Sequence, residues 1–180
     1  MGRIAKTYTM HPALQVLLGL EMTGVILAAF LYLPPAANFA SPDAARIIVF
    51  HVPCAMVATV AYLISMIYAI KYLIRRRTAD DTKSAASASL GFLFTVLATV
   101  TGMIFARIEW GTAWNWDPRE TSILMLLIIY AAYFALRSAL PNSAVRAKTT
   151  AAYNILAGIV MPFFVFVLPR IAPATLHPNK

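Results

Sequence analysis

Three tryptophans fall within one short stretch of the sequence, at Trp110, Trp114 and Trp116. Small and polar residues such as Gly111 and Asn115 lie between them. Indole faces give broad, rigid apolar contact, and glycine lets the backbone approach a ligand closely. The stretch could therefore bind a flat apolar ligand. It could equally belong to the aromatic belt that anchors membrane proteins at the interface, and composition alone leaves both interpretations open.

Two histidines, His51 and His177, could add metal chemistry to such a surface. Neutral imidazoles that arrive from separate segments are suitable axial ligands for a haem iron. His51 precedes Val52-Pro53 at the expected start of a helix, where it could also be a simple interfacial polar residue. His177 taken alone is weak evidence. A metal-binding role for the pair requires the two segments to converge.

Two arginines, Arg107 and Arg170, lie at the expected outer ends of apolar blocks. Each could simply mark the interface. The alternative hypothesis is that they pair with carboxylates such as haem propionates, for which the guanidinium fork is suited. Glu21 is a carboxylate inside an apolar block, which makes it a functional candidate by default. It could also be protonated and hydrogen-bonded between helices.

Asp117 follows the tryptophans directly and begins the run Asp117-Pro118-Arg119-Glu120. An N-cap residue, a proline at the first helical position and an acid at the third are typical of a capping box. Asp117 could therefore serve only to satisfy free amide groups at a helix start. It could also hold the tryptophan stretch against that helix end, and the two roles are compatible.

Membrane helices are the elements that must position these residues. The chain has 180 residues, of which 61% are hydrophobic and 12% charged, whereas a soluble domain has roughly a quarter charged residues. Its apolar blocks are about 20 residues long, enough to cross a bilayer core of ~30 Å. We predict an all-α integral membrane protein, a bundle of about five transmembrane helices with an outer tryptophan-rich loop. The expected spans of this single membrane domain, residues 1–180, are about 13–33, 53–73, 86–105, 118–136 and 151–168, the last kinked at Pro162.

Basic residues set the expected orientation. Most of the 15 lysines and arginines lie in the N-terminal segment, the second-to-third connection and the fourth-to-fifth connection. The positive-inside rule then predicts a cytoplasmic N-terminus and an extracytoplasmic C-terminus in a multi-pass membrane protein. The three outer segments, 34–52, 106–117 and 169–180, would gather the tryptophans, His51 and His177 on one face. The net charge of +8 is thus explained by topology, and we expect membrane lipid, not nucleic acid, as a partner.

Several functional classes are excluded by their missing motifs. The chain has one cysteine, Cys54, so it has no C-x-x-C-H haem-attachment motif and is not itself a c-type cytochrome. No Ser/His/Asp triad, phosphate-binding glycine loop or H-E-x-x-H motif is evident. These absences argue against a hydrolase or an ATPase subunit.

The segment from Trp110 to Thr121, WGTAWNWDPRET, resembles the tryptophan-rich "WWD" signature of the CcmC, CcmF and CcsA haem-handling superfamily. Its pattern is close to W-G-x-x-W-x-W-D. His51-Val52-Pro53 is similar to the histidine that the family has at the outer end of its second span. The resemblance covers residues from about 49 to 177, and the small size of the chain favours the CcmC branch of cytochrome c assembly factors.

This resemblance implies a function for each candidate residue. A platform for transiently bound haem b would comprise Trp110, Gly111, Trp114, Trp116 and Asp117, with Arg107 and Arg170 nearby, and His51 and His177 would be the axial ligands. The CcmC branch passes haem to the chaperone CcmE and works with CcmD and the CcmAB transporter. We therefore expect a haem-binding and haem-delivery factor rather than an enzyme. A ligand that must move on suits an open tryptophan shelf with few, exchangeable contacts.

The sequence also departs from the family pattern. Ala113 stands where many CcmC proteins have a further tryptophan, and the sixth span expected after the second histidine is missing because the chain ends at Lys180. His177 is therefore the less secure ligand. The alternatives are a CcsA-like subunit of a haem-attachment synthase, a haem permease, for which Glu21 alone is thin support, and a b-type electron carrier. The last expects paired histidines inside the spans, where none is found.

Overall fold

A computed structural model of the chain describes residues 10–36 and 39–177, and all regular secondary structure within them is helical. Five helical stretches are long and apolar enough to cross a membrane. The prediction of an all-α integral membrane protein is therefore confirmed. The long helices are α1 (Pro12–Leu31), α2 (Ile48–Arg75), α3 (Thr78–Glu109), α4 (Pro118–Ala139) and α5 (Ser143–Pro162); the short ones are η1 (Ala44–Ile47), η2 (Phe163–Val167) and α6 (Leu168–Ile171).

The chain divides into two compact units, residues 1–46 and 47–180. In the first, the His11 ring caps α1 by accepting a hydrogen bond from the Ala13 amide (3.3 Å). Arg46 donates to the Leu33 carbonyl (3.0 Å) and forms an ion pair with Asp43 (3.1 Å), which folds the segment after α1 back on itself. Glu21 is exposed on α1 within this unit. That the whole chain forms one membrane domain stays a prediction.

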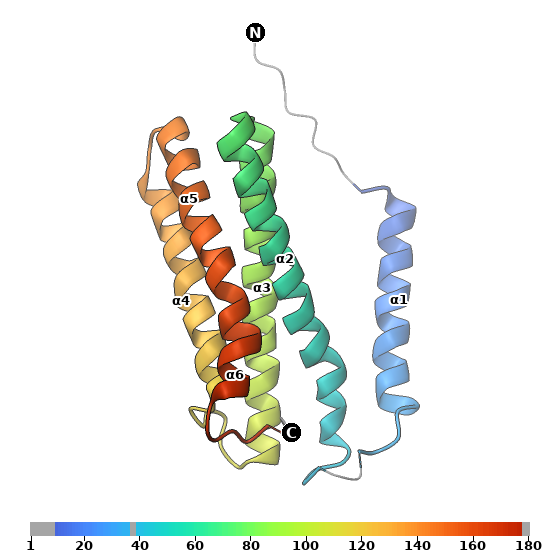
Figure 1. Ribbon diagram of the computed structural model, residues 1–180. Coiled ribbons are helices and arrows are strands. Elements are labelled where there is room, and N and C mark those ends of the chain that lie inside the picture. Colours follow the sequence, from blue (N-terminus) through green and yellow to red (C-terminus); the bar gives the residue numbers. More distant parts are fainter. Residues whose placement is uncertain (1–9, 37–38, 178–180) are drawn as a thin grey trace. The chain divides into compact units, whose positions relative to one another are not determined.

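The second unit contains the four helices α2 to α5, which run up and down in turn (Figure 1). The turns that join α2 to α3 and α4 to α5 lie at one end of this unit, and the α3–α4 loop and the C-terminal segment lie at the other. The N-terminal end of α2, which carries His51, is also at the second end. Three segments far apart in the sequence therefore share one end of the unit.

Close approach between helices dominates the core of this unit. The rings of Tyr62 and Tyr130 stack with centroids 3.6 Å apart, and the Tyr62 hydroxyl hydrogen-bonds the Thr95 hydroxyl (2.9 Å). A Cβ atom at Gly91 would come within 2.6 Å of the Tyr62 ring, so only glycine fits there. Many other buried residues are small as well, which is how membrane helices pack without a hydrophobic driving force; they include Ala58, Ala61, Ala69, Ala88, Ala98 and Ala157.

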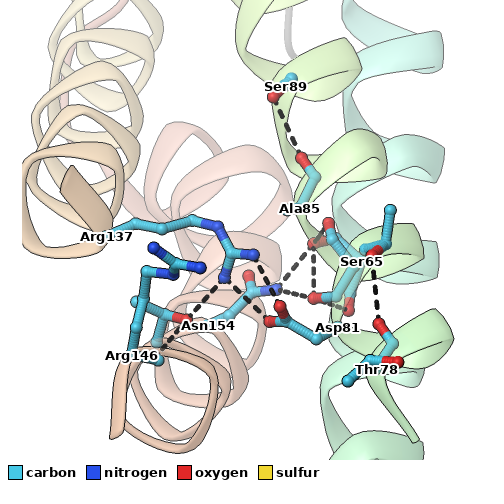
Figure 2. Close-up of polar contacts among 11 residues, drawn as sticks. Ser65, Thr78, Asp81, Ala85, Ser89, Arg137, Arg146 and Asn154 are labelled. Atoms are coloured by element: carbon cyan, nitrogen blue, oxygen red, sulfur yellow. Dashed lines mark hydrogen bonds and ion pairs between the residues drawn. The ribbon is translucent and has the colours of Figure 1, made fainter. Parts of the chain in front are cut away.

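A polar cluster fixes the helices near the turns that join α2 to α3 and α4 to α5 (Figure 2). The Arg137 guanidinium of α4 donates to both carboxylate oxygens of Asp81 on α3 (2.8 and 2.7 Å) and to the Thr150 hydroxyl of α5 (2.9 Å). The buried Asn154 amide donates to the hydroxyls of Ser65 (2.6 Å) and Ser84 (2.9 Å). These contacts bind all four helices to one another.

The helical backbone changes form immediately after Pro162, where the sequence predicts a kink. The α-helix α5 gives way to the π-helical stretch η2 and then to the single turn α6. Proline has no N–H to donate, so the regular hydrogen-bond pattern cannot continue unchanged around it. The result delivers the C-terminal segment to the end of the unit that carries the tryptophan loop.

Candidate functional site

The α3–α4 loop, residues 110–117, makes two turns that need positive φ angles. Gly111 has φ +83° and Trp116 has φ +57°. Glycine adopts this conformation freely, whereas a residue with a Cβ is strained there by about 1–2 kcal/mol. Trp116 is also 69% exposed, so the loop holds a strained backbone while it presents a large apolar side chain outward. Strain of this kind concentrates at functional sites.

The loop ends in a capping box, as the sequence predicts. The Asp117 carboxylate accepts a hydrogen bond from the Arg119 amide (2.9 Å). In return the Glu120 carboxylate accepts from the amides of Asp117 (3.3 Å) and Asn115 (2.6 Å). The start of α4 thereby fixes the last residues of the tryptophan loop.

Asp117 also binds the C-terminal segment, which the sequence did not indicate. Its side chain accepts from the Thr175 hydroxyl (2.8 Å), the Leu176 amide (2.7 Å) and Nδ1 of His177 (3.0 Å). The Asp117 side chain has no exposed surface, and that of His177 is 21% exposed. A single carboxylate thus joins the start of α4 to the segment that follows α6.

The electrostatics of this pair favour an ionised carboxylate and a neutral imidazole. Burial acts to raise the pKa of Asp117, but the hydrogen bonds from Arg119, Leu176 and Thr175 and the nearby His177 outweigh it, and the pKa lies below its ordinary value. Burial lowers the pKa of His177, and the charge of Arg119 adds to this, against the opposing effect of Asp117. The His177 imidazole is therefore neutral at pH 7.

Aromatic contacts connect the loop to His177. The Trp110 ring meets the His177 ring edge-on, with centroids 4.9 Å apart and planes inclined at 75°. Phe105, in the last turns of α3, meets the Trp110 ring edge-on, with its centroid 5.5 Å from that of Trp110. Trp114 packs against Trp116 at 5.8 Å with nearly perpendicular planes. The three predicted indoles thus form two groups, one at His177 and one further along the loop.

His51 lies in the first turn of α2, against α3. Its Nδ1 donates to the Ala98 carbonyl (2.9 Å) and lies 3.1 Å from the Thr101 hydroxyl. The ring covers Gly102, where a Cβ atom would come within 2.9 Å of its Cε1. Glycine at this position is what lets the imidazole lie against the helix.

One face of α3 connects the surroundings of the two histidines. Ala98, Thr101, Gly102 and Phe105 follow the spacing of a single helix face. His51 contacts the first three of these residues, and Phe105 contacts Trp110, which in turn contacts His177. The charge of Arg119 also acts on both histidines. A series of contacts along one face of α3 thus links the surroundings of the two histidines.

Hydrogen bonding gives both histidines the same tautomer. A carbonyl oxygen and an ionised carboxylate only accept, so Nδ1 carries the proton in His51 and in neutral His177. Nε2 is then left with a free lone pair, which is the arrangement that metal-binding histidines have. No cluster of three or more His, Cys, Asp or Glu side chains occurs within residues 10–36 and 39–177. Two such nitrogens are the donor set that a haem iron needs, because the porphyrin supplies its other four ligands.

The two predicted arginines lie at this end of the unit but bind local carbonyls. Arg107 donates to Gly111 (2.6 Å) and Arg170 to Phe166 (2.6 Å). Both are exposed and each keeps further N–H donors. The sequence reasoning missed the residues that support the histidines. The sequence held two signals for these residues. Thr101 and Gly102 are a polar and a small residue side by side in an apolar helix, and Thr175 carries a hydroxyl two residues before His177.

Comparisons with known proteins identify the family of the chain. The model of the family CcmC, described as heme exporter protein C, matches residues 3–176. The chain is similar to heme exporter protein C of Rhodobacter capsulatus, with 35% identity over 67% of this chain and 49% of the relative. The corresponding protein of Bradyrhizobium diazoefficiens is 31% identical over 80% of this chain and 56% of the relative. That of Escherichia coli K12 is 33% identical over 69% of this chain and 50% of the relative. The chain spans about half the length of the curated relatives it matches.

Proposed function

We propose that this chain, which belongs to the CcmC family of heme exporter protein C, binds haem at the outer face of a bacterial inner membrane and delivers it to a haem chaperone during cytochrome c assembly. His51 and His177 would ligate the iron through Nε2, and the tryptophan loop would support the porphyrin. Haem b would be the cargo, and the protein would ligate it, orient it and release it.

One observation carries the proposal: both histidines hold a proton on Nδ1 and leave Nε2 free. A histidine that only caps a helix or faces the interface needs no such arrangement. Here one histidine from α2 and one from the C-terminal segment have the same tautomer, and both segments lie at one end of the second unit. Two neutral nitrogen ligands suit a haem iron.

The surroundings of the histidines support a cargo site rather than a closed cofactor pocket. Trp116 is largely exposed, Arg107 donates to Gly111 of the loop, and Arg170 lies in α6 at the same end of the unit. Both guanidinium groups have donors to spare. They would bind the propionates, for which their geometry is suited. An open site of this kind lets a partner approach the haem edge.

The proposal includes an orientation and partners. The positive-inside rule assigns the arginine-rich turn after α2 to the cytoplasm, and the tryptophan loop and C-terminus to the periplasm. The receiving partner would be a CcmE-like haem chaperone, and CcmD-like and CcmAB-like subunits would complete the assembly. The alternative, a CcsA-like synthase subunit, predicts instead that a C-x-x-C-H apocytochrome accepts the haem.

Absorption spectroscopy of the purified protein tests the ligation. We expect the wild type to carry haem with a low-spin, bis-imidazole spectrum. His51→Ala and His177→Ala should each lose one ligand and most of the haem, and added imidazole should restore the six-coordinate spectrum. Trp114→Ala should lower haem retention with the ligation unchanged.

His11→Ser is the matched control, because His11 is the third histidine and its cap on α1 can be replaced by a serine hydroxyl. Its haem content and spectrum should equal those of the wild type. Unchanged Soret bands in the His51 and His177 variants would contradict the ligand assignment. Transfer of haem to an apocytochrome peptide, with no transfer to a chaperone, would support the synthase alternative in place of delivery.

A further inference from the structure

Asp117 has more contacts than a helix cap requires. It accepts a hydrogen bond from the Arg119 amide, 2 residues away in the sequence. It also accepts hydrogen bonds from Thr175, Leu176 and His177, which lie 58 to 60 residues further along the chain. The first contact starts α4, and the other three hold the C-terminal segment. The carboxylate is therefore shared between a local and a long-range task.

The carboxylate has no capacity left for a ligand. An ionised carboxylate has about four lone-pair sites, two on each oxygen. Oδ1 accepts from the Arg119 amide and from His177, and Oδ2 accepts from Thr175 and Leu176. The side chain also has no exposed surface. Asp117 therefore cannot be part of the surface that a porphyrin touches.

We propose that Asp117 is a positioning residue, whose carboxylate orients the His177 ring with Nε2 as its ligand atom and holds the 173–177 segment against the start of α4. This inference rests on the proposed function, because it assigns His177 its ligand role. It moves Asp117 from the expected haem platform to the support of the second histidine.

The segment itself is built for this orientation. The Thr175 hydroxyl donates to Asp117 and accepts from the His177 amide (3.1 Å). Trp110 packs against the His177 ring from another direction, at 4.9 Å. The imidazole is thus fixed by a carboxylate, a backbone turn and an indole. Carboxylate partners of metal-bound histidines set both the tautomer and the ring orientation.

Asp117→Asn is the decisive variant, because asparagine keeps the size and shape of aspartate and replaces one acceptor oxygen by an NH₂ donor. The asparagine side chain has one oxygen and one NH₂ group. In either orientation, the NH₂ group therefore faces N–H donors whose hydrogen bonds the carboxylate had accepted. With the NH₂ toward His177, the ring must accept at Nδ1, and its proton moves to Nε2, where it blocks the iron. The same orientation takes the Oδ1 acceptor away from the Arg119 amide, so the substitution disturbs the ligand together with one cap hydrogen bond.

Glu120→Ala is the matched control. Glu120 forms the other half of the capping box by accepting from the Asp117 and Asn115 amides, and it makes no hydrogen bond to His177. Loss of this side chain weakens the start of α4 and leaves the His177 hydrogen bond in place. A role confined to helix capping would make the two variants alike.

Nitrogen NMR of apo protein labelled with ¹⁵N-histidine in detergent reads the tautomers directly. We expect the His177 proton on Nδ1 in the wild type and in Glu120→Ala, and on Nε2, wholly or in part, in Asp117→Asn. His51 should not change in any of them. In the molecules whose NH₂ faces Leu176 instead of His177, the Leu176 amide loses its acceptor, so amide exchange of residues 173–177 should be faster in Asp117→Asn than in Glu120→Ala.

Haem spectroscopy adds a second result. Asp117→Asn should retain haem about 10–100-fold less tightly than the wild type, the usual cost of losing such a partner, whereas Glu120→Ala should stay near the wild type. An unchanged His177 tautomer together with unchanged amide exchange of residues 173–177 in Asp117→Asn, or equal changes in Glu120→Ala, would overturn the positioning role. If the wild type retains no haem, the proposed function fails, while the apo spectra still decide whether Asp117 sets the His177 tautomer.

Discussion

The His51 imidazole lies against Gly102 so closely that a Cβ atom there would come within 2.9 Å of its Cε1 and 3.4 Å of its Nδ1. The ring cannot easily move aside, because Nδ1 is bound to the Ala98 carbonyl at 2.9 Å. The position of the first proposed ligand thus depends on the absence of a side chain on the neighbouring helix.

Gly102→Ala should therefore displace His51 and lower haem retention by about 10-fold, comparable to the loss of a ligand's supporting contact. The protein should still fold, since alanine favours helix relative to glycine by roughly 1 kcal/mol. Haem content per purified protein checks this. Gly24→Ala, where a Cβ meets open space within its own unit, is the control and should keep its haem; equal retention in both variants would contradict the prediction.

Tryptophan fluorescence should report directly on the proposed site, because all three tryptophans of the chain lie in the α3–α4 loop. Haem added to apo protein should quench most of this emission by energy transfer. His51→Ala and His177→Ala should need higher haem concentrations for the same quenching. A titration that leaves the emission unchanged while haem absorbance shows binding would mean that haem binds elsewhere.

The Arg137–Asp81 ion pair should stabilise the second unit. Its side chains are only 20% and 15% exposed, so Arg137→Ala leaves a carboxylate poorly solvated and should cost about 2 kcal/mol of unfolding free energy. Denaturant unfolding in detergent measures this. Asp43→Asn, in the Arg46–Asp43 pair whose carboxylate is 74% exposed, should cost about 0–1 kcal/mol. Haem ligation should be the same in both, since the Arg137 cluster and the histidines lie near opposite ends of the unit.

Cysteine labelling tests the proposed orientation. In a Cys54→Ser background, Thr112→Cys places a thiol in the tryptophan loop and Ser143→Cys places one at the start of α5; both positions are exposed. A membrane-impermeant maleimide applied to spheroplasts should label the first and not the second. Solubilised protein should be labelled at both sites. The reverse pattern would place the tryptophans in the cytoplasm and contradict haem presentation at the outer face.

Much of the helical fold could be predicted from the sequence. Apolar blocks of membrane-spanning length, the Pro162 irregularity and the capping box at Asp117 depend on residues within a few positions of one another. The helices nevertheless extend beyond the expected spans, as in α2 and α3, because a helix continues past the apolar region when polar residues such as Thr78 and Lys83 can remain in contact with water.

By itself, the sequence determined which segments are helical, where the unusual residues lie along the chain and which family they resemble. Only the tertiary structure decided which atoms meet: Nδ1 of His51 with the Ala98 carbonyl, and the Asp117 carboxylate with His177. Hydrophobic blocks and caps are local properties of the chain. Contacts across tens of residues depend on how each helix is rotated and packed against its neighbours, and so does the tautomer of each histidine.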